Sequence, residues 1–402
     1  MPVSSAAPQA ISSRLVALMA FCCALAVSTI YYHQPLLPQI AASFGLAPTH
    51  AGLIATLTQL GYAAGLLLIV PLADCRQPRQ IALLAIAVNA VALIVCAAAP
   101  SFTLLCVSCV VVGVTAITAQ IIIPVLSGLA TLTERGRIVG GLLSGLSAGL
   151  LLARTIGGVV GAYTGWRVVF IMASLTDVLL LIIVARSLPA TANLTAIPYA
   201  GLMRSLGSLV LEERVLRYCA AGGLMTFAGF SALWASLAAL LAQPPYEFDS
   251  ATIGLFGLVA LLGIALSPCI GVLADRLGAR TMVLAGAVAL TVGFAFIAAG
   301  GQSLGSLIVG MVLLDFGNRA GLIANQARVF TLRPEARSRL NTVFMGAYFL
   351  GGAVGAALGN YGVHQSGWIG LAVVGTLLAL GATVINVLSP REPSSTPAEA
   401  RS

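Results

Sequence analysis

Twelve apolar segments follow one another along this chain, and each is long enough to cross a lipid bilayer as a helix. About twenty apolar residues in a helix span the hydrocarbon core once. The chain is 59% hydrophobic and only 8% charged, whereas an ordinary soluble domain carries roughly a quarter charged residues. We therefore predict an all-α membrane protein of 12 transmembrane helices, surrounded by the lipid bilayer. The segments are residues 15–43, 51–73, 80–99, 102–129, 138–163, 168–187, 217–242, 250–273, 281–300, 304–328, 341–362 and 367–389.

The arginines indicate how these segments cross the membrane. The net charge of +8 rests on 20 arginines, because the chain has no lysine. If the N-terminus is cytoplasmic, every arginine except Arg154, Arg167 and Arg319 falls in a cytoplasmic loop or tail. Positive residues favour the cytoplasmic side of a membrane. We therefore predict that both termini are cytoplasmic, and the basic excess gives no support to nucleic-acid binding.

The two halves of the chain repeat each other. The tripeptide Leu-Ala-Asp at 72–74 recurs at 273–275, and Gly-Trp at 165–166 recurs at 367–368, so the offset is 201 to 202 residues. Such a period, half the chain length, indicates duplication of a six-span unit. We predict an N-terminal six-helix half at 1–187, a cytoplasmic linker at 188–214 and a C-terminal six-helix half at 215–402. Within the linker, residues 199–211 have the pattern of a short interfacial amphipathic helix.

The loop after the eighth segment carries the most specific motif. GVLADRLGAR at 271–280 matches the pattern G-x-L-A-D-R-x-G-x-R almost position for position. Its first-half copy, VPLADCRQPR at 70–79, keeps Leu-Ala-Asp and a basic residue but loses both glycines. Over essentially its whole length the chain resembles the major facilitator superfamily, whose cytoplasmic loops carry this signature. The resemblance implies two pseudo-symmetric six-helix bundles and alternating access, with the solute site between the halves near the middle of the membrane.

A narrower resemblance comes from the first segment. YYHQPLLP at 31–38 is similar to a bacterial subgroup of efflux-type permeases, which are akin to drug–proton antiporters. In those antiporters the fifth span carries G-x-x-x-G-P-x-x-G-G, and here Ala153-Arg154 stands where Gly-Pro is expected. This departure argues against proton-driven drug antiport. The resemblance also implies a protein of the bacterial inner membrane that works as a monomer.

Ionisable groups inside a span are costly in lipid and are therefore candidates for function. Asp315 and Arg319 stand four residues apart in the tenth segment, so they share a helix face. Asn318, Asn325 and Gln326 extend that polar stripe, and the resemblance implies that this span lines the central cavity. We predict a solute or proton site in which Asp315 titrates and Arg319 binds an anion or restrains Asp315. The alternative is a self-neutralising pair that only fixes helix packing.

Arg154 and Asp177 are the other charged residues inside spans. Arg154 lies about nine residues before the outer end of the fifth segment, and Asp177 about nine residues after the outer start of the sixth. At similar depth on neighbouring antiparallel helices they can form an intramembrane ion pair, which would offset the cost of either charge alone. Alternatively, Arg154 binds solute or helps to move a proton.

Weaker candidates for the same site are polar or aromatic. A histidine in the outer half of the first span can titrate near physiological pH, although a lone membrane histidine is more often a packing residue. Three aromatic residues share one face of the seventh segment and can contact an apolar solute, or they can simply pack. These candidates are His33, Gln34, Gln120, Phe227, Phe230 and Trp234.

The signature loops are predicted to be conformational latches rather than solute ligands. A carboxylate there can bond to a helix N-terminus and to an arginine only while the cytoplasmic side is closed. The alternative is that these residues are merely solvated loop positions. The predicted latch residues are Asp74, Arg79, Arg137, Gly271, Asp275, Arg276, Gly278, Arg280 and Arg339.

These features predict a secondary active transporter that moves a small organic solute by alternating access, with proton-coupled efflux as the leading mode. Alternatives are an uncoupled or symport-type importer of a sugar or another metabolite, and a solute sensor that does not transport. No metal-ligand cluster or nucleophile motif stands in any span, so we expect no enzyme activity, no metal and no cofactor. Without a lysine the chain cannot form the phosphate-binding loop G-x-x-x-x-G-K-[ST], which argues against direct ATP drive.

Overall fold

The computed structural model describes residues 12–131, 134–190, 198–261, 270, 272–273, 276–333 and 336–390. Over these residues the chain is helical, and nine helices are long and apolar enough to cross a membrane. The longest of these, Arg337–Leu388, is two spans joined at a break, and Ser13–Ser28 and Ser250–Val259 begin two more. The described helices are thus consistent with the twelve spans that the sequence predicts.

The first half contains six spans, two of which are interrupted. The first span is made of α1, η1 and α2, and the fourth is made of α5 and α6. Its elements are α1 (Ser13–Ser28), η1 (Gln34–Leu36), α2 (Leu37–Ser43), α3 (Gly52–Cys75), α4 (Pro78–Ala98), α5 (Phe102–Thr115), α6 (Thr118–Leu129), α7 (Arg135–Thr164) and α8 (Trp166–Ser187).

The second half follows a linker helix, α9. Its eighth span starts as α11 and η2 and continues into a stretch that lies largely outside the described residues. The elements are α9 (Tyr199–Glu212), α10 (Arg214–Leu241), α11 (Ser250–Leu255), η2 (Phe256–Val259), α13 (Ala279–Ala298), α14 (Leu304–Leu332) and α15 (Arg337–Leu388).

Proline accounts for a break within the predicted first span, and glycine accounts for the break between the eleventh and twelfth spans. The segment predicted as one helix over 15–43 leaves the α-helix at Thr29 and resumes as a 3-10 turn with Pro35 at its start. Proline has no N–H to continue the ladder, so a helix restarts at it more easily than it runs through it. In α15 the break falls at Ser366 and Gly367, and Gly367 has φ +57°, a value that glycine adopts without steric cost.

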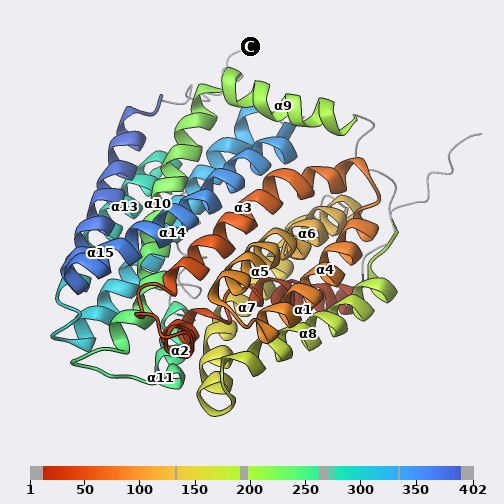
Figure 1. Ribbon diagram of the computed structural model, residues 1–402. Coiled ribbons are helices and arrows are strands. Elements are labelled where there is room, and N and C mark those ends of the chain that lie inside the picture. The colour runs from red at the N-terminus through yellow and green to blue at the C-terminus, as the bar shows by residue number, and fades with distance from the viewer. Residues whose placement is uncertain are drawn as a thin grey trace, which may run out of the picture.

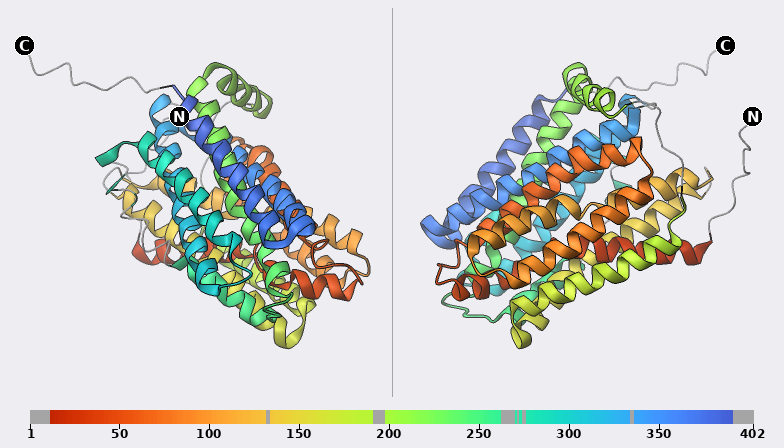
Figure 2. Two further views of the ribbon diagram at one scale, coloured as in Figure 1. Left: turned by 90° about the vertical axis from the view of Figure 1, so that its left-hand side faces the viewer. Right: turned by 45° about the vertical axis from the view of Figure 1, so that its right-hand side comes forward.

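The two sets of spans form two bundles that lie side by side. In Figure 1 the helices from α1 to α8 occupy one side, and α10, α13, α14 and α15 occupy the other. In the left view of Figure 2 the helices of the second half lie in front of those of the first. The bundles meet where α3 packs along α15 and where α7 packs on α11. α9 lies at one end of the molecule, which we call the α9 end. α2 and α11 lie at the opposite end, which we call the α2 end.

Equivalent hydrogen bonds repeat in the two bundles. Ser28 in the first span donates to the Gly149 carbonyl at 3.1 Å, and Ser231 in the seventh donates to the Gly352 carbonyl at 2.7 Å. Each bond ties the first span of a bundle to its fifth. Both pairs of positions are 203 residues apart, within one residue of the sequence repeat, so the duplication extends to how the helices are joined.

Loop arginines repeat in the same way. Arg79 donates to the Ala185 carbonyl, and Arg280 donates to the Val387 carbonyl at 2.6 Å. Each joins the start of a bundle's third span to the end of its sixth. A cation at the end of a helix satisfies its last carbonyls and interacts well with the helix dipole. These two arginines therefore have a structural role within their own bundles.

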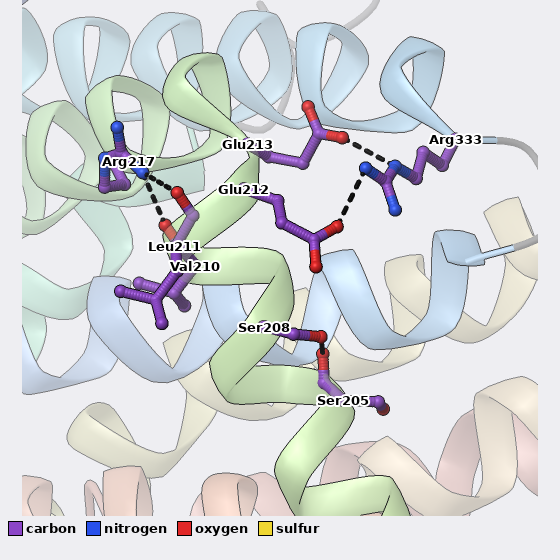
Figure 3. A network of polar contacts seen from close by, with 8 residues as sticks. All are labelled: Ser205, Ser208, Val210, Leu211, Glu212, Glu213, Arg217 and Arg333. Carbon is purple, nitrogen blue, oxygen red and sulfur yellow. Dashed lines mark hydrogen bonds and ion pairs between the residues drawn. The ribbon is translucent and has the colours of Figure 1, made fainter.

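The predicted amphipathic linker helix is present as α9. It buries Leu202, Leu206 and Leu209, which lie on one helix face. At its end Glu212 and Glu213 both pair with Arg333 of the second bundle, at 3.1 and 2.6 Å, as Figure 3 shows. At its start the Tyr199 hydroxyl donates to the Leu68 carbonyl of α3 at 3.0 Å. α9 therefore bridges the two bundles.

Candidate solute site between the bundles

Arg154 occupies the centre of a buried polar site. It lies in α7 and is 2% exposed. Its Nε donates to the Gln34 Oε1 at 2.7 Å. The guanidinium carbon lies 3.9 Å from the centre of the Trp234 ring and 4.8 Å from that of Tyr31. Since Trp234 belongs to α10, the guanidinium is held by side chains of both bundles.

One nitrogen of this guanidinium makes no hydrogen bond to the described residues. Arg154 Nη1 is buried and has no hydrogen-bond partner among the described residues. Stacking on two aromatic rings returns roughly 0.5–2 kcal/mol per ring, whereas removing a charged group from water costs several kcal/mol. The hydrogen bond to Gln34 adds about 1.5–3 kcal/mol, so these contacts offset much of that cost but leave Nη1 without an acceptor among the described residues.

The predicted ion pair of Arg154 with Asp177 is not present in this structure. Arg154 is engaged by Gln34 and the aromatic rings, and within the described part of the chain Asp177 Oδ2 has no hydrogen-bond partner. Asp177 is buried in α8, where its charge interacts with Tyr32. Similar depth on neighbouring helices was the basis of the prediction, but Arg154 contacts Gln34, Trp234 and Tyr31 instead.

We expect Asp177→Asn to leave the unfolding free energy unchanged or to raise it by up to about 1 kcal/mol, because it removes a buried carboxylate that lacks a cation. Thermal unfolding of the purified variant in detergent measures the change. A loss of unfolding free energy larger than about 2 kcal/mol would show that the carboxylate has a stabilising partner. That result would support the predicted ion pair with Arg154.

Asp315 and Arg319 form the second charged element of the site. Arg319 Nε lies 2.7 Å from Asp315 Oδ2, and both residues are in α14 as predicted from their spacing. Asp315 is buried, whereas the Arg319 side chain is 19% exposed. The charge of Asp315 also interacts with Arg154 across the boundary between the bundles. One carboxylate thus faces two guanidinium groups.

An aromatic wall connects these charges. Phe227 stacks on Tyr348 with ring centres 4.2 Å apart, and Phe230 lies between Phe227 and Trp234 at 5.8 and 6.1 Å. The Tyr348 hydroxyl donates to the Asn318 Oδ1 at 2.8 Å. All four rings are buried. Phe227, Phe230 and Trp234 are therefore next to the charged groups, as the stripe in the sequence predicts.

Sequence reasoning missed several members of the site. Tyr31 stacks on Arg154, Tyr348 is bonded to Asn318, and the buried Gln59 presents Oε1 without a hydrogen-bond partner among the described residues. Tyrosine and glutamine do not stand out within an apolar segment as a charge does. An uncharged polar residue within an apolar span is the sequence signal that would have indicated Gln59.

The remaining predicted residues lie at different places. His33 is 2% exposed, and its Nε2 has no hydrogen-bond partner in the described chain. Gln120 donates to the Tyr62 hydroxyl at 3.4 Å. Gln326 donates to Asn341 at 2.8 Å, and Asn325 is fully buried with neither amide atom bonded to a described residue. Asn325 and Gln326 stand about two helical turns from Arg319 towards the α9 end.

Most predicted latch residues have other partners here. Arg137 is exposed and pairs with Glu134 at 3.5 Å, whereas Arg79 and Arg280 bond within their own bundles. Asp74 is half-buried at the end of α3, without an ion pair among the described residues. Of the others, Arg276 and Gly278 are exposed, Arg339 is half-buried, and Gly271 and Asp275 lie outside the described residues.

Contacts at the α2 end close the site from that side. Thr155 donates to the Gly254 carbonyl at 3.0 Å, which joins α7 directly to α11. The pocket beside the guanidinium has a volume of about 10 Å³, roughly the minimum for one water molecule. Residues of both bundles line it: Gln34, Pro35, Arg154, Trp234, Leu237, Ala238 and Ile253.

The family of the chain follows from comparison with known proteins. The model of the Major Facilitator Superfamily matches residues 16–263 and 219–402. The chain belongs to the major facilitator superfamily. It is thus a membrane transport protein rather than an enzyme, and the two-bundle fold is that of this superfamily.

Individual proteins that are similar to this chain are also named as transporters. The uncharacterized transporter YgaY of Escherichia coli is 36% identical over 370 residues, which cover 92% of this chain and 94% of that protein. A protein named a probable transporter in Streptomyces coelicolor is 33% identical over 392 residues, covering 96% of this chain and 91% of its own. The solved nucleoside transporter NupG has the same fold, with a TM-score of 0.73 at 11% identity, covering 93% of this chain and 98% of that one.

Proposed function

We propose that the protein is a secondary active transporter that moves a small organic solute by alternating access through the site around Arg154 and Asp315. The observation that carries the proposal is the incomplete pairing of this site: Arg154 and Asp315 are buried, Arg319 is half-buried, and Arg154 Nη1 has no partner among the described residues. Such groups inside a membrane protein mark a solute or ion path.

Proton coupling is part of the proposal, with Asp315 as the titrating group. Its carboxylate bonds to Arg319 on its own helix and faces Arg154 of α7 and Tyr348 of α15. A group held by so few partners can change its protonation when the bundles separate, because its distance from Arg154 changes. His33, which also interacts with Arg154, is the second candidate for proton transfer.

We propose efflux as the direction, on the resemblance to efflux-type permeases. Import by symport is the second candidate, and the charges of the site favour it. A negatively charged solute bound at Arg154 would offset the positive charge that favours the ionised Asp315, and Asp315 would then take up a proton. Solute and proton would move together in the same direction.

Further parts of the proposal concern placement and motion. The α9 end is cytoplasmic in a bacterial inner membrane, the protein works as a monomer, and the halves 1–187 and 215–402 move about the linker 188–214. Asp74 reaches Arg137 only when the α9 end closes. The closed α2 end and the absence of an ion pair at Asp74 among the described residues support this order of events.

Transport into vesicles tests the proposal. Purified protein is reconstituted, a proton gradient is imposed in either direction, and flux is measured across solute classes. We expect solute movement that follows the gradient and reverses with it; the sense of the reversal separates efflux by antiport from symport. Flux that ignores the proton gradient would rule out the coupling, and the lack of flux for every class would rule out transport.

A further inference from the structure

We infer that the transported solute is an organic anion with an apolar, preferably aromatic, body, and that its charged group binds the guanidinium of Arg154. The inference rests on the proposed function, since it names the solute class of the same site. It is carried by the charge of the site, by the geometry of Arg154 and by the rings beside it.

The charge balance of the site is positive. Arg154 and Arg319 both face it, and Asp315 is the carboxylate that interacts with them among the described residues. Asp315 is already bonded to Arg319 at 2.7 Å, and Asp177 Oδ2 makes no hydrogen bond to either arginine or to any other described residue. A solute that brings one negative charge would neutralise the site, whereas a cation would add to the excess.

The guanidinium of Arg154 is prepared for a carboxylate. Its plane is held by Trp234 and Tyr31, and its Nε is held by Gln34, which accepts a hydrogen bond and adds no charge. Nη1 stays without a partner in the described chain. A guanidinium presents its donors as a rigid planar fork that matches a carboxylate. Because Gln34 and the rings orient the group in advance, little side-chain freedom remains to be lost on binding.

The rings next to Arg154 favour an apolar body. Trp234, Phe230, Phe227 and Tyr348 follow one another from Arg154 to the neighbourhood of Asn318. Planar apolar groups gain contact area on such a wall, and aromatic groups gain further from ring–ring packing. An inorganic anion would leave this wall unused, so we infer an organic one.

The solute meets Arg154 when the α2 end opens. The pocket beside the guanidinium is too small for a carboxylate in this conformation, and its lining residues Pro35, Leu237 and Ile253 lie towards the α2 end. Movement of α11 away from α7 would break the bond of Thr155 to Gly254 and widen this pocket. Anion binding should therefore stabilise the conformation that is open at the α2 end.

Tryptophan fluorescence provides a test that does not require transport. The chain has three tryptophans, so Trp166→Phe with Trp368→Phe leaves Trp234, which touches the guanidinium, as the reporter. The purified protein in detergent is titrated with three matched sets of probes: benzoate, benzamide and benzamidine; the corresponding 1-naphthyl compounds; and octanoate, octanamide and octylamine. We expect at least one acid to saturate the signal and to bind at least about tenfold more tightly than its neutral and cationic counterparts.

Variants of Arg154 locate the binding. Arg154→Gln should weaken the dissociation constant of the best acid by about thirtyfold or more, since a hydrogen bond to a charged group is lost together with the charge. Arg154→Lys keeps the charge without the planar fork and should weaken it less. The control is Arg167→Gln, which also removes one positive charge but from an exposed arginine at the α2 end, away from the site, and it should leave anion binding unchanged.

The outcomes decide between clear alternatives. The inference is overturned if no acid binds, if the amides or cations bind as tightly as the acids, or if Arg154→Gln and Arg154→Lys bind the acid as the parent does. If Arg154→Gln does not fold, the preference of the parent for acids and the effect of Arg154→Lys still decide. Anion binding without flux in vesicles would support the anion site and refute the proposed transport. Flux restricted to neutral or cationic solutes would support transport and refute the anion site.

Discussion

Asp315→Asn is expected to abolish solute accumulation driven by a proton gradient while leaving solute exchange across the vesicle membrane. For one proton per solute, a gradient of one pH unit supports about tenfold accumulation, and the variant should show none. Asparagine keeps the size of the side chain and can still accept a hydrogen bond from Arg319, but it cannot take up or release a proton. The contact that asparagine has to reproduce is short: Arg319 Nε lies 2.7 Å from Asp315 Oδ2.

The measurement compares gradient-driven uptake with exchange at equal pH on both sides, in vesicles that contain equal amounts of protein. Asp177→Asn is the matched control, because it removes another buried carboxylate of a membrane span that lies outside the site. The control should accumulate solute normally. If Asp315→Asn still accumulates solute with the gradient, Asp315 is not the coupling group, and His33 becomes the residue to test.

Gly355→Ala is expected to lower the unfolding free energy by about 1–3 kcal/mol, and Gly355→Leu by more, so that the leucine variant accumulates poorly in membranes. A Cβ atom at Gly355 would lie 2.6 Å or less from three backbone atoms of Ala228. Backbone atoms cannot rotate away as a side chain can. The methyl group therefore forces α10 and α15 apart at the place where they cross most closely, and small residues at such crossings are what let membrane helices pack.

Thermal unfolding in detergent measures this effect, and Gly140→Ala in α7 is its control. A Cβ at Gly140 meets no atom within 4 Å, so alanine there should be neutral or stabilise the helix by up to about 1 kcal/mol. Gly149→Ala should repeat the loss in the first bundle, where the Cβ would lie 2.2 Å from the Ala24 carbonyl oxygen. Equal unfolding temperatures for Gly355→Ala and Gly140→Ala would contradict the close approach of α10 and α15 at Gly355.

Hydropathy and repetition in the sequence determined the fold to a large extent. An apolar run must satisfy its backbone internally in lipid, so length alone predicts a spanning helix. The repeat at 201 to 202 residues predicts two like bundles, and the family and the paired bonds of Ser28 and Ser231 agree with it. The breaks in the first and fourth spans were missed, because an apolar composition says little about where a helix is interrupted.

The site was predicted in part, and the errors have one physical origin. Spacing along one helix correctly placed Asp315 with Arg319, because residues four apart share a face whatever surrounds them. The partner of Arg154 depends on how α7 is turned and on which helices adjoin it, and neither follows from residue spacing. The predicted pairing with Asp177 is absent, because Arg154 contacts Gln34 and the aromatic rings.

The amino-acid sequence by itself therefore determined the apolar spans, their duplication and the identity of the buried charges, since these depend on local composition and on the cost of charge in lipid. Only the tertiary structure decided that Arg154 rests on Gln34, 120 residues away, and on Trp234 of the other bundle. Contacts between distant segments depend on the packing of whole helices. For this reason the charges are visible in the sequence, while the site that they form is visible only in the structure.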